Sequence, residues 1–150
     1  SVGIDEGNTL KEKLNIAVHC IDFMKKLKKT PKIATLSYAR PGDYGRSEEI
    51  NQSLDDAKKL TQLIEKHTNQ KIENSCVLID QAIKNKCNIL IAPNGIVGNT
   101  IFRTLVLLNS WPSFGAITFG IDDIYIDTSR DQSRECYLRS LELAYKLAKL

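Results

Sequence analysis

Paired metal-binding motifs are missing from this sequence. None of its four cysteines, Cys20, Cys76, Cys87 and Cys136, forms a C-x-x-C pair, and neither histidine stands at metal-ligand spacing to them. The common zinc-binding patterns are therefore excluded, and we predict no metal site. Scattered cysteines of this kind are typical of reduced, mostly buried thiols, so we expect a cytoplasmic protein.

Long apolar runs and strong charge are missing too. No apolar stretch approaches the roughly 20 residues that a membrane span needs, and no basic-then-apolar leader opens the chain. A net charge of +3 is weak evidence for nucleic-acid binding. We therefore predict no membrane and no nucleic-acid partner. Because the chain opens on Ser1 rather than Met, we expect it to be a fragment or processed product whose N-terminal part is absent.

The chain does contain clear signals for alternating helices and short apolar strands. Thr9 and Glu12 form a capping box, followed by apolar residues at helical spacing as far as about Lys29. We predict further helices over 48–64, 75–86, 100–108 and 134–150, with 100–108 buried. We predict strands over 32–38, 70–73, 88–92, 114–119 and 124–126. This order predicts one α/β domain over 1–150, three-layered, with a largely parallel sheet.

The loop after the first strand is the first candidate site. Ser37 and Tyr38 end the strand, and Arg40 and Arg46 follow among glycines before the next helix. Arginine can bind a phosphate or carboxylate through two parallel hydrogen bonds. The alternative is a solvated loop with surface arginines.

The segment 93–99 is the second candidate. Gly95 and Gly98 allow close backbone approach to a ligand, ahead of the helix predicted from Thr100. The segment does not match G-x-G-x-x-G or the Walker A pattern, so a dinucleotide or P-loop site gains no support. The alternative is a simple strand-to-helix turn.

The third candidate is the stretch from Asp127 through Ser129 to Arg130. A hydroxyl and a guanidinium stand here between a strand and the last helix, where backbone N–H groups favour an anion. The alternatives are structural: Ser129 could cap the last helix, and Arg130 could form a surface ion pair. The adjacent acids Asp122 and Asp123 are more typical of a solvated turn than of a cation site.

Taken in order, these segments resemble the second half of phosphotransacetylases and phosphotransbutyrylases. The resemblance covers the strand end at Ser37 and Tyr38, the segment 93–99, the stretch 115–120 and the stretch 127–130. It implies a phosphotransacetylase-like, isocitrate-dehydrogenase-like fold with the site in a cleft between two domains. It also implies acyl transfer between coenzyme A and phosphate. The cofactor is unknown from the residues themselves, and the resemblance implies coenzyme A or phosphate.

The departures from that family point to a divergent branch. The position of the acyl transferases' general base falls on Cys136, and Asp131 replaces the glycine that follows Ser-Arg. With the segment 3–7 near the start, these features look more like MtxX, the methanogenesis marker protein 4 family, labelled a methyltransferase subunit. The resemblance implies ligand contacts from Ser37, Tyr38, Gly98, Asn99, Ser129 and Arg130, and leaves the catalytic residues unknown.

Three functional hypotheses follow, and they imply different partners. The first is an MtxX-type transferase that binds a small anion or an acyl- or methyl-bearing cofactor. The alternatives are a non-catalytic binding or assembly subunit, with a methyltransferase or corrinoid protein as partner, and a genuine phosphate acyltransferase. The closing helix carries an apolar stripe at Leu138, Leu141 and Tyr145. We therefore also expect a homodimer formed through that helix or through 100–108.

Overall fold

The computed structural model describes residues 3–129 and 132–150. The chain divides into two compact units, 3–98 and 99–150, which we describe separately. The helix α4 (Gly95–Arg103) begins in the first unit and ends in the second. Among the described helices, none is long and apolar enough to cross a membrane.

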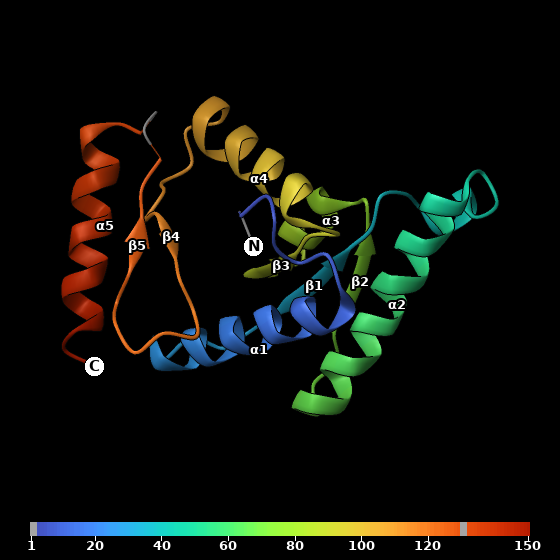
Figure 1. The fold of residues 1–150 in the computed structure, drawn as a ribbon, viewed down its shortest axis with the longest axis horizontal. Helices are drawn as coiled ribbons and strands as arrows, with labels where there is room; N and C mark the ends of the chain where they lie inside the picture. Colours follow the sequence, from blue (N-terminus) through green and yellow to red (C-terminus); the bar gives the residue numbers. More distant parts are fainter. Residues whose placement is uncertain (1–2, 130–131) are drawn as a thin grey trace. The chain divides into compact units, whose positions relative to one another are not determined.

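The first unit is built on a three-stranded parallel sheet in the order β2-β1-β3. The strands are β1 (Ile33–Leu36), β2 (Glu73–Cys76) and β3 (Ile89–Ile91). The helices α1 (Leu10–Lys26) and α2 (Glu48–Thr68) pack against each other and against this sheet, as Figure 1 shows, and α3 (Ile79–Lys84) packs on β2. The predicted α/β fold with a parallel sheet is therefore confirmed.

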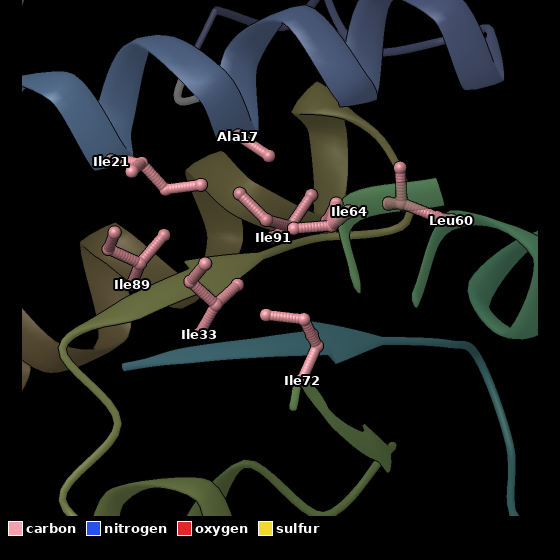
Figure 2. Close-up of a cluster of buried hydrophobic side chains, with 8 residues drawn as sticks. All are labelled: Ala17, Ile21, Ile33, Leu60, Ile64, Ile72, Ile89 and Ile91. Atoms are coloured by element: carbon pink, nitrogen blue, oxygen red, sulfur yellow. The ribbon is translucent and has the colours of Figure 1, made fainter. Parts of the chain in front are cut away.

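The main core of this unit lies between the sheet and the two long helices. Figure 2 shows its side chains, which come from α1, α2, the sheet and the segment before β2: Ala17, Ile21, Ile33, Leu60, Ile64, Ile72, Ile89 and Ile91. Every residue of β1 is buried, so this strand is covered on both faces. Thr35 of β1 and Thr61 of α2 join their hydroxyl groups at 2.7 Å, which satisfies the polar atoms that this core contains.

Local sequence signals set several of these boundaries. Thr9 Oγ1 accepts from the Glu12 N–H at 3.2 Å and Glu12 Oε2 accepts from the Thr9 N–H at 3.1 Å, so the predicted capping box starts α1. Ser47 caps α2 through the N–H of Ile50, and Asn69, in the left-handed conformation, ends it.

Several sequence-based boundaries were wrong, including those of the strands expected over 114–119 and 124–126, which are shorter or shifted. The strand expected over 70–73 is β2, Glu73–Cys76, because pairing with β1 extends to Cys76. The helix expected from 75 therefore begins only at Ile79. The helix expected over 100–108 begins earlier, at Gly95, where Asn94 Oδ1 accepts from the N–H of Val97, and ends in a π-helical turn, Thr104–Leu108.

The second unit consists of short and mostly exposed elements. Its strands, β4 (Ala116–Ile117) and β5 (Ile126–Asp127), form their own antiparallel pair. The closing helix is α5 (Arg134–Leu147). The expected burial of 100–108 is also wrong, because these residues are half-buried or exposed and Leu108 is 83% exposed.

Candidate functional site

The ends of β1 and β3 meet at one edge of the parallel sheet. Thr35 pairs with Ile91, so the residues that follow each strand emerge side by side. Tyr38 follows β1 and Asn94 follows β3, and Asn94 Nδ2 donates to Tyr38 Oη at 2.7 Å. This bond joins two of the segments that the sequence had singled out, at the edge where ligands bind in parallel α/β folds.

A pocket of about 210 Å³ lies at this edge, wholly within the first unit. Its walls come from the segment before α1, from α1 and α2, and from the ends of β1 and β3: Asn8, Lys13, Tyr38, Glu49, Gln52, Ser53, Asp56, Pro93 and Asn94. It is smaller than the roughly 300–1,000 Å³ of sites for drug-sized ligands. It therefore suits a small molecule or the reactive end of a larger one.

Lys13 brings a buried positive charge to the pocket. Its side chain is 8% exposed, and its Nζ lies 3.7 Å from Asp56 Oδ2. Asp56 Oδ1 in turn accepts from Gln52 Nε2 at 2.7 Å. At this distance the positive charge of the buried lysine is only partly compensated. An oxygen atom of a ligand could compensate the remainder.

Tyr38 and Ser53 supply hydroxyl groups to the same pocket. The Tyr38 N–H donates to Ser53 Oγ at 3.0 Å, which ties the end of β1 to α2. Burial raises the pKa of Tyr38, and the negative charges of Glu49 and Asp56 act in the same direction. Tyr38 therefore stays a neutral phenol that can donate a hydrogen bond throughout the physiological pH range.

The remaining residues of the first predicted loop lie elsewhere. Ser37 is buried and donates from its Oγ to the carbonyl of Ala39 at 2.9 Å, so its hydroxyl holds the turn. Arg40 is exposed beside the 3₁₀ turn Pro41–Asp43. The side chain of Arg46 is 72% exposed and its Nε lies 3.1 Å from Asp43 Oδ1. Neither arginine lines the pocket.

The glycines of the second predicted segment lie within the first turns of α4. Gly95 is buried, and its N–H donates to the carbonyl of Glu6 at 2.9 Å. A Cβ at Gly95 would overlap the carbonyl oxygen of Gly3, so the close approach here is to the chain's own backbone. Gly98 is also buried and Asn99 is half-buried in the same helix. None of these three residues lines the pocket.

The third predicted segment is only partly described. Ser129 is half-buried, and its carbonyl accepts from Tyr137 Oη at 3.2 Å. Arg130 lies outside the described residues. Asp122 and Asp123 are exposed, and no group of three or more histidine, cysteine or acidic side chains in the described part of the chain could hold a metal ion.

Cys136 has a distinct environment in the second unit. It lies in the first turn of α5, and its Sγ accepts from Ser133 Oγ at 3.7 Å and from Arg139 Nη2 at 2.9 Å. The hydrogen bond from Ser133 lowers the pKa of the Cys136 thiol, and the positive charge of Arg139 lowers it further. These contacts favour the thiolate form.

Sequence reasoning missed the pocket residues supplied by the two helices, above all Lys13, Ser53 and Asp56. One signal was available for Lys13. It stands four residues before Ala17 and eight before Ile21, which places a lysine on the buried face of α1. A charged residue on a core face is unusual unless it is paired, and here the partner comes from α2.

Comparison with known proteins confirms the resemblance to MtxX. No protein-family model matches the chain. Over 130 residues, 86% of the chain, it is 38% identical to "Putative methyltransferase mtx subunit X" from Methanosarcina mazei and 37% identical to its namesake from Methanosarcina barkeri. An uncharacterized methyltransferase from Methanocaldococcus jannaschii is 32% identical over 92% of the chain. The chain spans about half the length of these relatives, between 45% and 56%.

The solved structures that resemble the chain are phosphotransacylases. A phosphotransacetylase from Streptococcus pyogenes superimposes with a TM-score of 0.68 at 22% identity, covering 99% of this chain and 48% of that one. The EutD phosphotransacetylase from Staphylococcus aureus gives a TM-score of 0.67 at 20% identity, covering 96% and 48%. At these identities the likeness establishes the fold, and the expected phosphotransacetylase-like fold is confirmed.

Proposed function

We propose that this chain is the substrate-binding part of a transferase that moves a methyl or acyl group. The observation that carries the proposal is the similarity to methyltransferase-named proteins at 37–38% identity over most of the chain. The pocket at the carboxyl edge of β1 and β3 supports it, because the relatives' fold class binds its ligands at this edge.

The pocket fits the small reactive end of a cofactor better than its phosphates. Its wall contains two carboxylates, those of Glu49 and Asp56, and one ammonium group, that of Lys13. A phosphate would therefore meet net negative charge. Coenzyme A, when bound, would supply the thiol that accepts or gives an acyl group. We propose that its acyl end enters the pocket, with Tyr38 and Ser53 donating hydrogen bonds, and that Arg40 and Arg46 contact its phosphates outside.

Binding measurements on the 150-residue chain test this proposal. We expect coenzyme A, acetyl-coenzyme A or methylcobalamin to bind measurably in a calorimeter. Tyr38→Phe should weaken that binding about two- to twelvefold, since one hydrogen bond contributes about 0.5–1.5 kcal/mol. Tyr44→Phe is the matched control, because Tyr44 is exposed in the neighbouring loop and does not line the pocket. No binding by any of the three, or equal effects of both variants, would contradict the proposal.

Cys136 favours a second candidate, a binding or assembly subunit without acyl-transfer chemistry. In the resembled acyl transferases a carboxylate stands at this position, and losing a general base costs a factor of about 10²–10⁴. An assay with acetyl phosphate and coenzyme A separates the two functions. This candidate predicts no turnover by the wild type, together with direct binding of a purified corrinoid protein. Turnover by the wild type would exclude it, and a gain of activity in Cys136→Asp would identify the missing group.

A further inference from the structure

The pocket of the first unit contains charges of both signs, on side chains that differ in how far they are exposed. Lys13 and Ser53 are buried, and Tyr38 is half-buried. Glu49 and Gln52 are exposed and Asp56 is half-buried, all three on one face of α2. The pocket therefore has a buried part that contains the ammonium and an outer wall that contains the carboxylates.

The buried part offers hydrogen-bond donors that the protein does not use. The Lys13 ammonium has three N–H groups, and its one ion pair among the described residues spans 3.7 Å, longer than a hydrogen bond. Tyr38 Oη accepts from Asn94, and Ser53 Oγ accepts from the Tyr38 N–H, so each keeps a hydroxyl proton to donate. These donors suit an oxygen acceptor with negative charge, such as a carboxylate.

The outer wall offers acceptors instead. Glu49 stands in the first turn of α2, and Asp56 follows seven residues later on the same face. Asp56 Oδ1 accepts from Gln52, while Oδ2 has, among the described residues, only the Lys13 ammonium at 3.7 Å. Two carboxylates that line one pocket favour a cationic group such as a protonated amine.

Neither a simple anion nor a simple cation satisfies both parts. A phosphate would use the donors of Lys13, Tyr38 and Ser53 but would be repelled by Glu49 and Asp56. An amine alone would satisfy the carboxylates but leave the buried donors without an acceptor. We propose that the pocket binds a small zwitterion, with its carboxylate at Lys13, Tyr38 and Ser53 and its ammonium group at Glu49 and Asp56. This inference rests on the transferase part of the proposed function, because it names the class of small molecule that the transferase would take, and it does not depend on which cofactor binds.

Titration of the ¹⁵N-labelled chain with matched small molecules tests the inference. Glycine, β-alanine and 4-aminobutyrate differ only in the separation of their two charges, while propionate and ethylamine carry one charge each. We expect the amide signals of Tyr38, Ser53 and Asn94 to shift with at least one zwitterion. We expect propionate and ethylamine to bind about ten- to hundredfold more weakly, because each loses one set of charge-assisted hydrogen bonds. Equal binding by either one, or binding by none of the five, would overturn the inference.

Two variants with matched controls assign the two ends of the ligand. Lys13→Met keeps an apolar stem in the buried position and should remove the preference for the carboxylate. Lys11→Met, at an exposed position of the same helix, should not. Glu49→Gln should weaken binding of the zwitterion and leave the affinity for propionate unchanged or higher. Glu48→Gln, at an exposed neighbouring position, should change neither affinity. If Glu48→Gln and Glu49→Gln act alike, general surface charge explains the effect and the inference fails.

The same samples separate this inference from the proposed function. If a zwitterion binds while coenzyme A, acetyl-coenzyme A and methylcobalamin do not, the inference stands and the cofactor proposal fails. If a cofactor binds while propionate matches every zwitterion, the inference fails and the transferase proposal stands.

Discussion

The two units of this chain bury their apolar side chains very differently. In 3–98, a cluster of isoleucines and a leucine between the sheet and two helices is almost completely buried. In 99–150, Cys136 is the only buried apolar residue of the described part, whereas Leu138, Leu141 and Tyr145 are 55%, 68% and 61% exposed. Since burial of apolar surface is the main stabilising contribution, we expect the first unit to be stable by itself and the second to depend on a further surface.

The largest effect should come from the core of the first unit. Ile64→Ala should lower the free energy of unfolding by about 2–5 kcal/mol, because Ile64 is 0% exposed and the change leaves a cavity. Leu141→Ala in α5 should change the free energy of unfolding of the monomer by less than about 0.5 kcal/mol. Urea titration checks both, with Leu63→Ala, at a 40% exposed position of α2, as the control for helix propensity. Equal losses of unfolding free energy from Ile64→Ala and Leu141→Ala would contradict the difference in burial between the two units.

The next effect concerns what covers the exposed face of α5. We propose that the chain forms a two-fold dimer through Leu138, Leu141 and Tyr145. Leu141→Ser should then weaken association by about 1.5–3 kcal/mol for each protomer, the value of burying one large apolar side chain. Sedimentation equilibrium measures this directly, and Leu63→Ser on α2 is the control. A wild-type chain that stays monomeric at tens of micromolar would disprove the dimer.

A smaller effect should show that the second unit is tightly packed at one point. Gly115 and Gly120 both have positive φ, but a Cβ at Gly115 would lie 2.5 Å from Ile126 Cγ2, whereas a Cβ at Gly120 would meet nothing within 4 Å. Both alanine variants carry the left-handed backbone cost. Gly115→Ala should cost about 1–3 kcal/mol more than Gly120→Ala because of overpacking. Hydrogen exchange of the β4 and β5 amides measures the difference in stability. Equal losses of stability in the two variants would show that the strand pair can shift to accommodate the added methyl group.

The smallest effect contrasts the thiols of the two units. Burial raises the pKa of Cys20, and burial together with Glu73 raises the pKa of Cys87, whereas the hydrogen bond from Ser133 and the charge of Arg139 lower the pKa of Cys136. As the pH rises, Cys136 should therefore become a thiolate first, followed by Cys20 and Cys87. Thiolate absorbance of single-cysteine variants measures this order. Arg139→Met should raise the pKa of Cys136, and an unchanged value would show that Arg139 is not involved.

Local signals predicted the elements, and long-range pairing decided their ends. The capping box at Thr9 and Glu12 and the apolar strand around Ile33 were read correctly, because each depends on nearby residues. The end of β2 at Cys76 depends on its pairing with Leu36, about 40 residues away, which no local pattern contains. The start of α4 at Gly95 was missed because glycine favours loops, whereas here Asn94 caps the helix.

The site was predicted in part for the same reason. Tyr38 and the segment around Asn94 follow strands, and parallel strands bring such residues together, so the sequence order indicated this edge. Lys13 and Asp56 come from two helices, and their meeting depends on how α1 packs on α2. All the predicted ligand contacts remain predictions: Ser37, Tyr38, Arg40, Arg46, Gly95, Gly98, Asn99, Ser129 and Arg130.

Hydrogen–deuterium exchange of the chain with and without a saturating cofactor tests the central claim, that the ligand binds in the pocket of the first unit. We predict slower exchange for amides of 37–38, 49–56 and 93–98 on binding of coenzyme A, acetyl-coenzyme A or methylcobalamin. Exchange in 60–68, the part of α2 beyond the pocket, should stay unchanged. Slower exchange confined to 99–150 would contradict the claim.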